Sequence, residues 1–89
     1  MKSKEQLIKD VVSEGYKDVR VCPLPPSIDT PEHTHDVHTV HIILDGELII
    51  TKKGKTHHYK PGDRVEFKAG TTHKAKSKEG GSMIIGVKK

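Results

Sequence analysis

Histidine is the residue type through which this sequence could most readily do chemistry. Seven of the 89 residues are histidines, and His33 and His35 are separated by a single residue. Side chains two positions apart in an extended segment project from the same face, so these two imidazoles can share one metal ion. Zinc, for example, takes imidazole nitrogens at about 2.0–2.1 Å. The pair therefore indicates a metal site, although two exposed loop histidines without a ligand would have the same spacing.

The other chemically capable side chains have structural interpretations that fit better. His57 and His58 are adjacent in a strand-like segment, so at most one of them can point inward. Asp63 follows Gly62 and suits the capping of a turn rather than proton transfer. The sequence contains no nucleophile–base pair, phosphate-binding loop or cysteine-rich zinc motif. The side chains that we expect in the core are Tyr59, Phe67 and Cys22.

The elements that must position the histidines are short β-strands joined by turns. Residues 18–21 alternate as in an edge strand, which the prolines at 23, 25 and 26 are expected to end. Residues 27–32 have no periodicity and predict a loop. The β-rich stretch 38–50 is interrupted at Asp45-Gly46, a strong turn or bulge signal. Further turns are expected at 52–55, 61–63 and 69–71, with strands at 56–59, 64–67, 73–77 and 82–87.

A short helix is predicted before the strands, over residues 3–14. Ser3 and Gln6 have the spacing of a capping box, and Gly15 is placed to end the helix. So short a helix is not stable in isolation, and it must pack on the outside of the strands or on a partner subunit. The apolar stripe that would make this contact is Leu7, Ile8, Val11 and Val12.

The length and composition predict one small domain, residues 1–89, with a modest core. One Phe, two Tyr and no Trp are available to fill it, and a homodimer would supply the apolar burial that the monomer lacks. No apolar run reaches membrane-spanning length, and residues 1–6 lack the apolar stretch expected of a signal peptide, so no membrane association is expected. A single cysteine fits a reduced, cytoplasmic location.

Charge is unevenly distributed along the chain. Residues 1–51 hold five basic and nine acidic side chains, and residues 52–89 hold eleven basic and three acidic, so charges of −4 and +8 give the net +4. No nucleic-acid motif or aromatic platform accompanies the lysines. We therefore expect a lysine-rich solvated surface and no nucleic-acid partner.

The histidines and glycines between His33 and His73 resemble the two signature motifs of the cupin superfamily. The first motif is a glycine, five residues, His-x-His, three or four residues, a glutamate, six residues and a glycine. The second is a glycine, five residues, Pro-x-Gly, two residues, a histidine, three residues and an asparagine. Six of the ten positions match: His33, His35, Gly46, Gly62, Gly70 and His73. The departures are Ser27 and Thr39 in the first motif, at a glycine and the glutamate, and Lys68 and Ser77 in the second, at the proline and the asparagine.

This resemblance implies an all-β fold, the cupin double-stranded β-helix or jelly-roll barrel, over about residues 19–87 behind the helix 3–14. It also implies that His33, His35 and His73 bind one divalent transition metal ion per chain: iron, nickel, zinc or manganese. Thr39 at the glutamate position leaves this set without a carboxylate, which favours an anionic small-molecule ligand or substrate, or else leaves the site vestigial. His41 shares a face with Thr39, so it is expected to face the barrel interior as a fourth ligand or a neighbour of the ligands, while His38 points away.

Three functions are compatible with the resemblance. The first is a three-histidine mononuclear metal oxygenase-type enzyme, since three protein ligands leave positions open for a substrate and dioxygen. The second is a non-catalytic barrel that binds or senses a metal or small molecule. The third is a metal-free cupin of the sugar isomerase or epimerase type, which is less favoured because those enzymes are usually larger. The fold alone does not decide among them.

Overall fold

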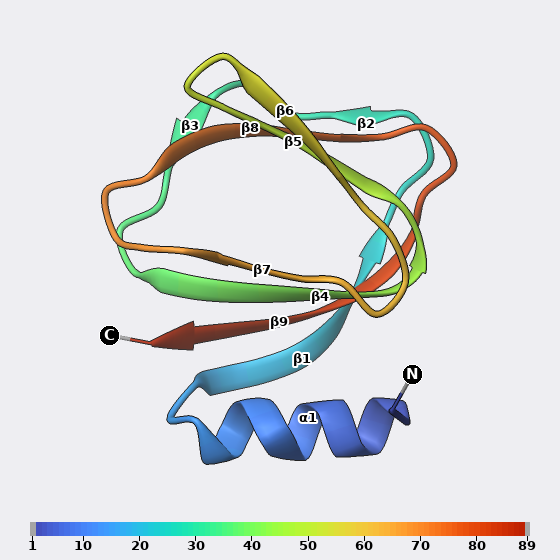
Figure 1. Ribbon diagram of the computed structural model, residues 1–89, viewed down its shortest axis with the longest axis vertical. Coiled ribbons are helices and arrows are strands. Elements are labelled where there is room, and N and C mark those ends of the chain that lie inside the picture. Colours follow the sequence, from blue (N-terminus) through green and yellow to red (C-terminus); the bar gives the residue numbers. More distant parts are fainter. Residues whose placement is uncertain (1, 89) are drawn as a thin grey trace.

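Two antiparallel sheets face each other and enclose the interior of a barrel, with one helix outside it (Figure 1). The computed structural model describes residues 2–88. One sheet has the strand order β1-β9-β4-β7, and the other has the order β2-β8-β5-β6, with β3 also paired to β8. The elements are α1 (Lys4–Ser13), β1 (Lys17–Leu24), β2 (Ile28–Asp29), β3 (His33–Thr34), β4 (His38–Gly46), β5 (Leu48–Lys52), β6 (Lys55–Tyr59), β7 (Arg64–Phe67), β8 (Thr72–Ser77) and β9 (Gly81–Lys88).

The predicted fold class, an all-β jelly-roll barrel with a short N-terminal helix, is confirmed. Strands that are distant in sequence are neighbours in both sheets: β9 lies between β1 and β4, and β8 lies between β2 and β5. Such crossing connections distinguish a jelly roll from a simple meander. Among the described residues 2–88, no helix has the length and hydropathy that crossing a membrane requires.

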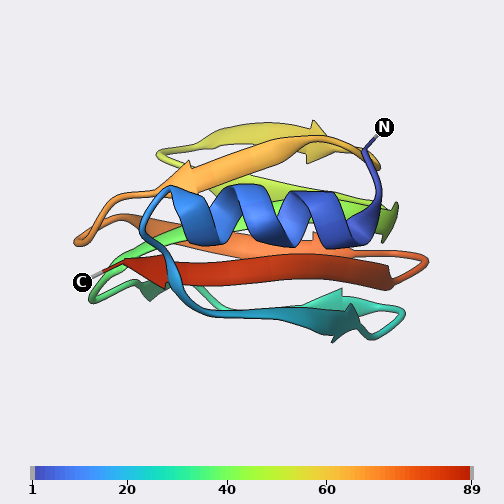
Figure 2. The ribbon, with the colours of Figure 1, turned by 90° about the horizontal axis from the view of Figure 1, so that it is seen from below.

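Helix α1 lies across the outer face of the first sheet, over β1 and β9 (Figure 2). Ser3 caps it by accepting a hydrogen bond from the Gln6 amide at 3.2 Å. After the helix the chain changes direction at Gly15, whose φ is +99°. Val11 is fully buried against Tyr16 and the outward-facing side chains of the sheet. Val12, predicted in the apolar stripe, is instead 53% exposed, because its direction turns it away from the sheet.

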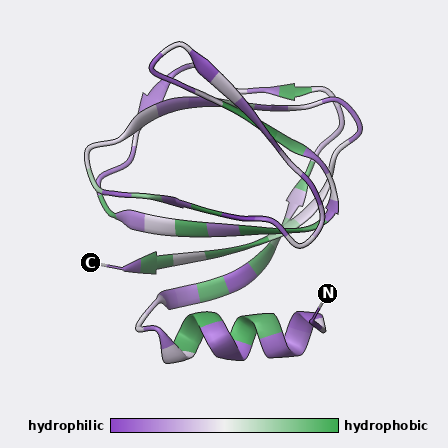
Figure 3. Cartoon of the chain, viewed as in Figure 1, coloured by the Kyte–Doolittle hydropathy of each residue, from purple (hydrophilic) through white to green (hydrophobic). Residues whose placement is uncertain are grey.

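The interior of the barrel is filled by aliphatic side chains and one aromatic ring. Ile43 is fully buried there and Phe67 is 2% exposed, and the rest of this cluster is Leu24, Leu48 and Ile50. Hydrophobic stretches are visible along α1, β4 and β9 (Figure 3). Strand β4 therefore serves two cores, since Val40 and Ile42 pack outward beneath the helix while Ile43 packs inward.

Three local predictions were wrong at the first sheet edge and the segment after it. Pro23 lies within β1 rather than ending it, because β1 is an edge strand and a missing amide is tolerated there. The predicted loop 27–32 contains β2, which pairs with β8. Cys22 is only half-buried, because neighbouring strand β9 covers β1 on one side alone.

The Lys53-Gly54 turn has positive φ at both residues, as expected for a two-residue hairpin loop.

Candidate metal centre

Three histidines from two paired strands and the turn beside them meet at one end of the barrel. His33 in β3 lies directly opposite His73 in β8, and His35 follows two residues after His33. The backbone of His35 is held on both sides: its amide donates to the Thr71 carbonyl at 3.1 Å, and its carbonyl accepts from the Gly70 amide at 2.8 Å. One ligand nitrogen from each imidazole lies within 4.8 Å of the others. The structure thus brings together the three residues that the sequence motifs single out.

The rings are oriented toward one another. His33 donates from Nδ1 to the Pro31 carbonyl at 3.0 Å, which leaves the Nε2 lone pair free; a metal-binding histidine characteristically makes this hydrogen bond with its other nitrogen. The Nε2 atoms of His35 and His73 face each other and lie 2.5 Å apart, within hydrogen-bonding distance. The Nδ1 atom of His73 is buried without a hydrogen-bond partner among residues 2–88.

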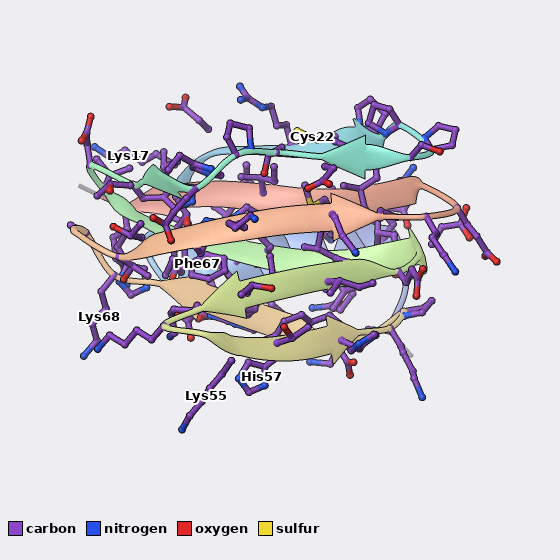
Figure 4. The ribbon with its side chains drawn as sticks, turned by 90° about the horizontal axis from the view of Figure 1, so that it is seen from above. Lys17, Cys22, Lys55, His57, Phe67 and Lys68 are labelled. Carbon is purple, nitrogen blue, oxygen red and sulfur yellow. The ribbon has the colours of Figure 1, made fainter. Side chains whose placement is uncertain are left out.

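Phe67 fixes the ring planes of two of these histidines. Its ring is parallel to that of His73, with centroids 4.1 Å apart, and it also stacks on His35 at 5.6 Å. Phe67 reaches this position from β7, where it is paired with Thr39 of β4. Phe67 belongs to the inner cluster of buried side chains, whereas Figure 4 shows Lys55 and His57 projecting outward from the β6 edge. The sequence predicts Phe67 in the core but gives no sign of its stacking on the histidines.

Burial favours the neutral form of His35, His41 and His73. It lowers the pKa of His73 to about 4, with further lowering by the neighbouring His35, His33 and Lys52. Burial also lowers the pKa of His35, an effect that the nearby Asp36 carboxylate opposes. For His41, burial and the same cluster of imidazoles lower the pKa to about 4. Neutral imidazole is the form whose lone pair can bind a metal ion.

Thr39 and His41 lie side by side on the inner face of β4, as predicted. Thr39 is 5% exposed and His41 is 8% exposed. Neither the Thr39 hydroxyl nor either ring nitrogen of His41 has a hydrogen-bond partner within the described part of the chain. His38 points to the opposite face, as predicted, where its Nε2 donates to Glu66 at 3.3 Å.

A small, largely apolar cavity of about 160 Å³ adjoins the three histidines. His41 contributes to its wall together with the triad. A cavity of roughly this size can hold a molecule such as benzene. Its other lining residues are mostly apolar, and include Leu24, Leu48, Ile50, Phe67 and Met83.

The remaining chemically capable residues lie away from this centre. His57 and His58 are both exposed, and Asp63 caps a turn by accepting from the Lys60 amide at 2.8 Å. One neighbour was not anticipated from the sequence. Lys52 follows Thr51, which pairs with the residue after His73, and its ammonium is close enough to lower the pKa of His73.

The donor set fits a divalent transition metal. Three imidazoles, one of them oriented by a backbone carbonyl, match the chemistry of zinc, iron or nickel, and three protein ligands leave coordination positions open. Among residues 2–88, the outer hydrogen bond typical of a metal-binding histidine is present at His33, whereas Nδ1 of His73 is buried without one.

Comparisons with known proteins agree with the fold. The family model described as "Cupin domain" matches residues 20–85, and a search of curated sequences found no significant match. An RmlC-like cupin from Shewanella frigidimarina is 19% identical, with a TM-score of 0.69 over 78% of this chain and 62% of its own. A predicted oxalate decarboxylase from Thermotoga maritima is 21% identical, with a TM-score of 0.68 over 89% and 71%. A protein of unknown function from Rhizobium leguminosarum is 23% identical, with a TM-score of 0.74 over 99% and 98%.

Proposed function

This chain belongs to the cupin-domain family, and from that premise we propose that it holds one divalent transition metal ion on His33, His35 and His73 and presents it to a small anionic molecule. The observation that carries the proposal is the convergence of the three imidazoles, with ligand nitrogens within 4.8 Å of one another, in the lining of a cavity. A bound ion would supply Lewis-acid or redox chemistry to a molecule in that cavity.

The electrostatics of the site support an anionic ligand. The triad contains no carboxylate, because Thr39 occupies the position where the resemblance implies glutamate. A dication on three neutral imidazole ligands keeps its full charge, and the positive charge of Lys52, which reaches His73, adds to it. We infer that a carboxylate or a similar anion is the group that this end of the cavity attracts.

The cavity favours some reaction classes over others. Its aliphatic lining and volume of about 160 Å³ suit a compact, mostly apolar molecule rather than a sugar, which needs many hydrogen-bonding partners. The metal-free sugar isomerase alternative is therefore the weakest. Three-histidine oxygenase-type chemistry is the version we favour, since its ligand set leaves positions open for a second reactant. A non-catalytic binding or sensing barrel is the alternative, and it uses the same site.

The metal content of the purified, untagged protein tests the proposal. Mass spectrometry should find about one transition metal ion per chain in the wild type, and loss of that ion in His35→Ala and His73→Ala. His57→Ala is the matched control, because His57 is exposed on β6 and away from the triad. A wild-type chain that holds no metal after reconstitution contradicts the proposal. If the bound metal is iron, the next assay is oxygen uptake in the presence of small-molecule substrates. No oxygen uptake in that assay would favour the binding alternative.

A further inference from the structure

His41 is a polar side chain buried without any contact that explains its polarity. It is 8% exposed, and neither Nδ1 nor Nε2 has a hydrogen-bond partner among residues 2–88. Burying an imidazole this way forfeits its hydrogen bonds to water. A hydrophobic residue at this strand position would pack as well and would leave nothing unsatisfied, so the role of His41 has to come from something that its nitrogens bind.

The surroundings of His41 exclude a partner within its own element. Its neighbours along the inner face of β4 are Thr39, whose hydroxyl is itself unpartnered among the described residues, and the aliphatic Ile43. Its ring meets the Phe67 ring edge-on at 5.4 Å. The ring borders the cavity beside the triad.

His41 does not belong to the cluster that could hold the metal. The three imidazoles with ligand nitrogens within 4.8 Å of one another are His33, His35 and His73. The His41 ring centroid lies 6.2 Å from that of His35. His41 therefore lines the cavity beside the triad without belonging to the triad.

We propose that His41 hydrogen-bonds to a polar group of the molecule bound in the cavity. In this arrangement the molecule is compact, with an anionic group at the histidine triad, an apolar body against Leu48 and Ile50, and a hydroxyl or carbonyl against His41. An imidazole carries both a donor and an acceptor nitrogen, so it can serve either kind of group. The anionic end of this description rests on the proposed function; the contact to His41 does not.

Two isosteric probes separate this contact from the rest of the site. Valerate and 4-hydroxybutyrate both have a carboxylate and a short chain, and they differ in a terminal methyl or hydroxyl. We expect the zinc-loaded wild type to bind 4-hydroxybutyrate about tenfold more tightly than valerate, as measured by titration calorimetry. A site built to hydrogen-bond a hydroxyl rejects the analogue that lacks one, because the site's own polar group is then left unpaired.

Variants at position 41 decide whether that preference comes from His41. His41→Leu should abolish or reverse the preference, and His41→Gln, which keeps a donor and an acceptor, should retain part of it. Thermal unfolding establishes that both variants fold. Equal binding of the two probes by the wild type, or a preference that His41→Leu leaves unchanged, overturns the proposal. Loss of zinc from a folded His41→Leu variant also overturns it, since His41 would then be a metal ligand.

The failure of the proposed function gives a different result. If the wild type retains no metal, the same ratio of affinities is measured on the metal-free chain, where Lys52 can still attract the carboxylate. A hydroxyl preference that depends on His41 in the metal-free protein supports the present inference and contradicts only the metal site. No preference there contradicts both.

Discussion

Thr39 is the residue at which this chain departs most informatively from the cupin signature. Its hydroxyl is buried and has no hydrogen-bond partner among residues 2–88. Replacing the threonine with a glutamate would therefore break no hydrogen bond. It lies on β4 opposite Phe67, whose ring stacks on His73. A longer side chain at position 39 would therefore extend from a backbone position close to the triad.

We expect Thr39→Glu to strengthen metal binding and weaken anion binding. A fourth, anionic ligand should raise the affinity for zinc about tenfold or more, which corresponds to roughly 1.4 kcal/mol, and should lower the affinity for a carboxylate probe by neutralising charge. Competition with a coloured chelator measures the first effect and calorimetry the second. Thr39→Val, which removes the hydroxyl without adding charge, is the control and should change neither. Unaltered chelator competition in Thr39→Glu would mean that position 39 does not reach the metal.

The sequence predicts the membership of the histidine cluster better than it predicts the geometry. The spacing of His33, His35 and His73 identifies three residues that the fold does bring together. The hydrogen bond from His33 to Pro31 and the stacking of Phe67 depend on side-chain rotamers and on strand register. Register follows from how both sheets pack, which local periodicity does not encode.

At the scale of the elements, a polar cluster fastens α1 to the first sheet. Glu66 on β7 accepts hydrogen bonds from the Tyr16 hydroxyl and from His38. Arg64 donates to Glu14 just beyond the C-terminal end of the helix at 2.5 and 2.8 Å, and lies 3.3 Å from Glu66. These contacts join the end of the helix to a strand that is distant in sequence. The Tyr16 hydrogen bond above all, together with His38 and Arg64, lowers the pKa of Glu66 to about 2.

Glu66→Gln should reduce the acid sensitivity of folding. Because the pKa of Glu66 is about 2 in the folded protein and near 4.5 when unfolded, its stabilising effect is complete above about pH 4.5 and is lost as the pH falls toward 2. The glutamine variant should be less stable at pH 7, by about 1 kcal/mol or less since Glu66 is partly exposed, and its stability should fall less steeply below pH 4.5. Urea titrations at several pH values measure both, with the exposed Glu79→Gln as control. If the free energy of unfolding had the same pH dependence in the wild type and Glu66→Gln, the predicted role of the Glu66 carboxylate would be wrong.

The contact between α1 and β9 depends on the absence of a side chain at Gly86. A Cβ there would lie 3.1 Å from both Tyr16 Cβ and Val11 Cγ1, and 3.3 Å from Val19 Cγ2. We expect Gly86→Ala to cost about 1–3 kcal/mol of stability through overpacking, without changing the metal content, since the helix lies on the outer face of the sheet. Val12→Ala on the same helix should cost no more than about 0.5 kcal/mol, because Val12 is 53% exposed. Chemical denaturation and metal analysis of the two variants test this, and equal stabilities would show that the interface can shift to accept a methyl group.

The elements themselves were largely predictable, and the errors have a common cause. The helix and most turns follow from caps, glycines and prolines, which act locally. Val12, Pro23 and β2 were misjudged because each depends on a neighbour: the sheet that α1 covers, the edge position of β1, and the strand β8 that pairs with β2.

At the scale of the whole molecule, the open edge of the first sheet at β1 carries an exposed apolar residue. Strand β1 is at the edge of its sheet and pairs within the described chain only with β9. Its Val21 is 42% exposed, one of two exposed large hydrophobic residues in the part of the chain that the structure describes. An apolar residue on an open strand edge favours association with another edge.

We therefore expect a homodimer in solution, in which β1 contributes to the interface. Light scattering coupled to size-exclusion chromatography should give about twice the 9.9 kDa mass of the chain. Val21→Lys should shift the equilibrium toward the monomer, since a charge on an edge strand opposes edge-to-edge pairing. Lys55→Glu on the edge strand of the other sheet is the control and should leave the mass unchanged. A wild-type protein that elutes as a monomer at micromolar concentration would contradict the expectation. A dimer insensitive to Val21→Lys would move the interface away from β1, and the exposed Val12 on α1 would become the next position to test.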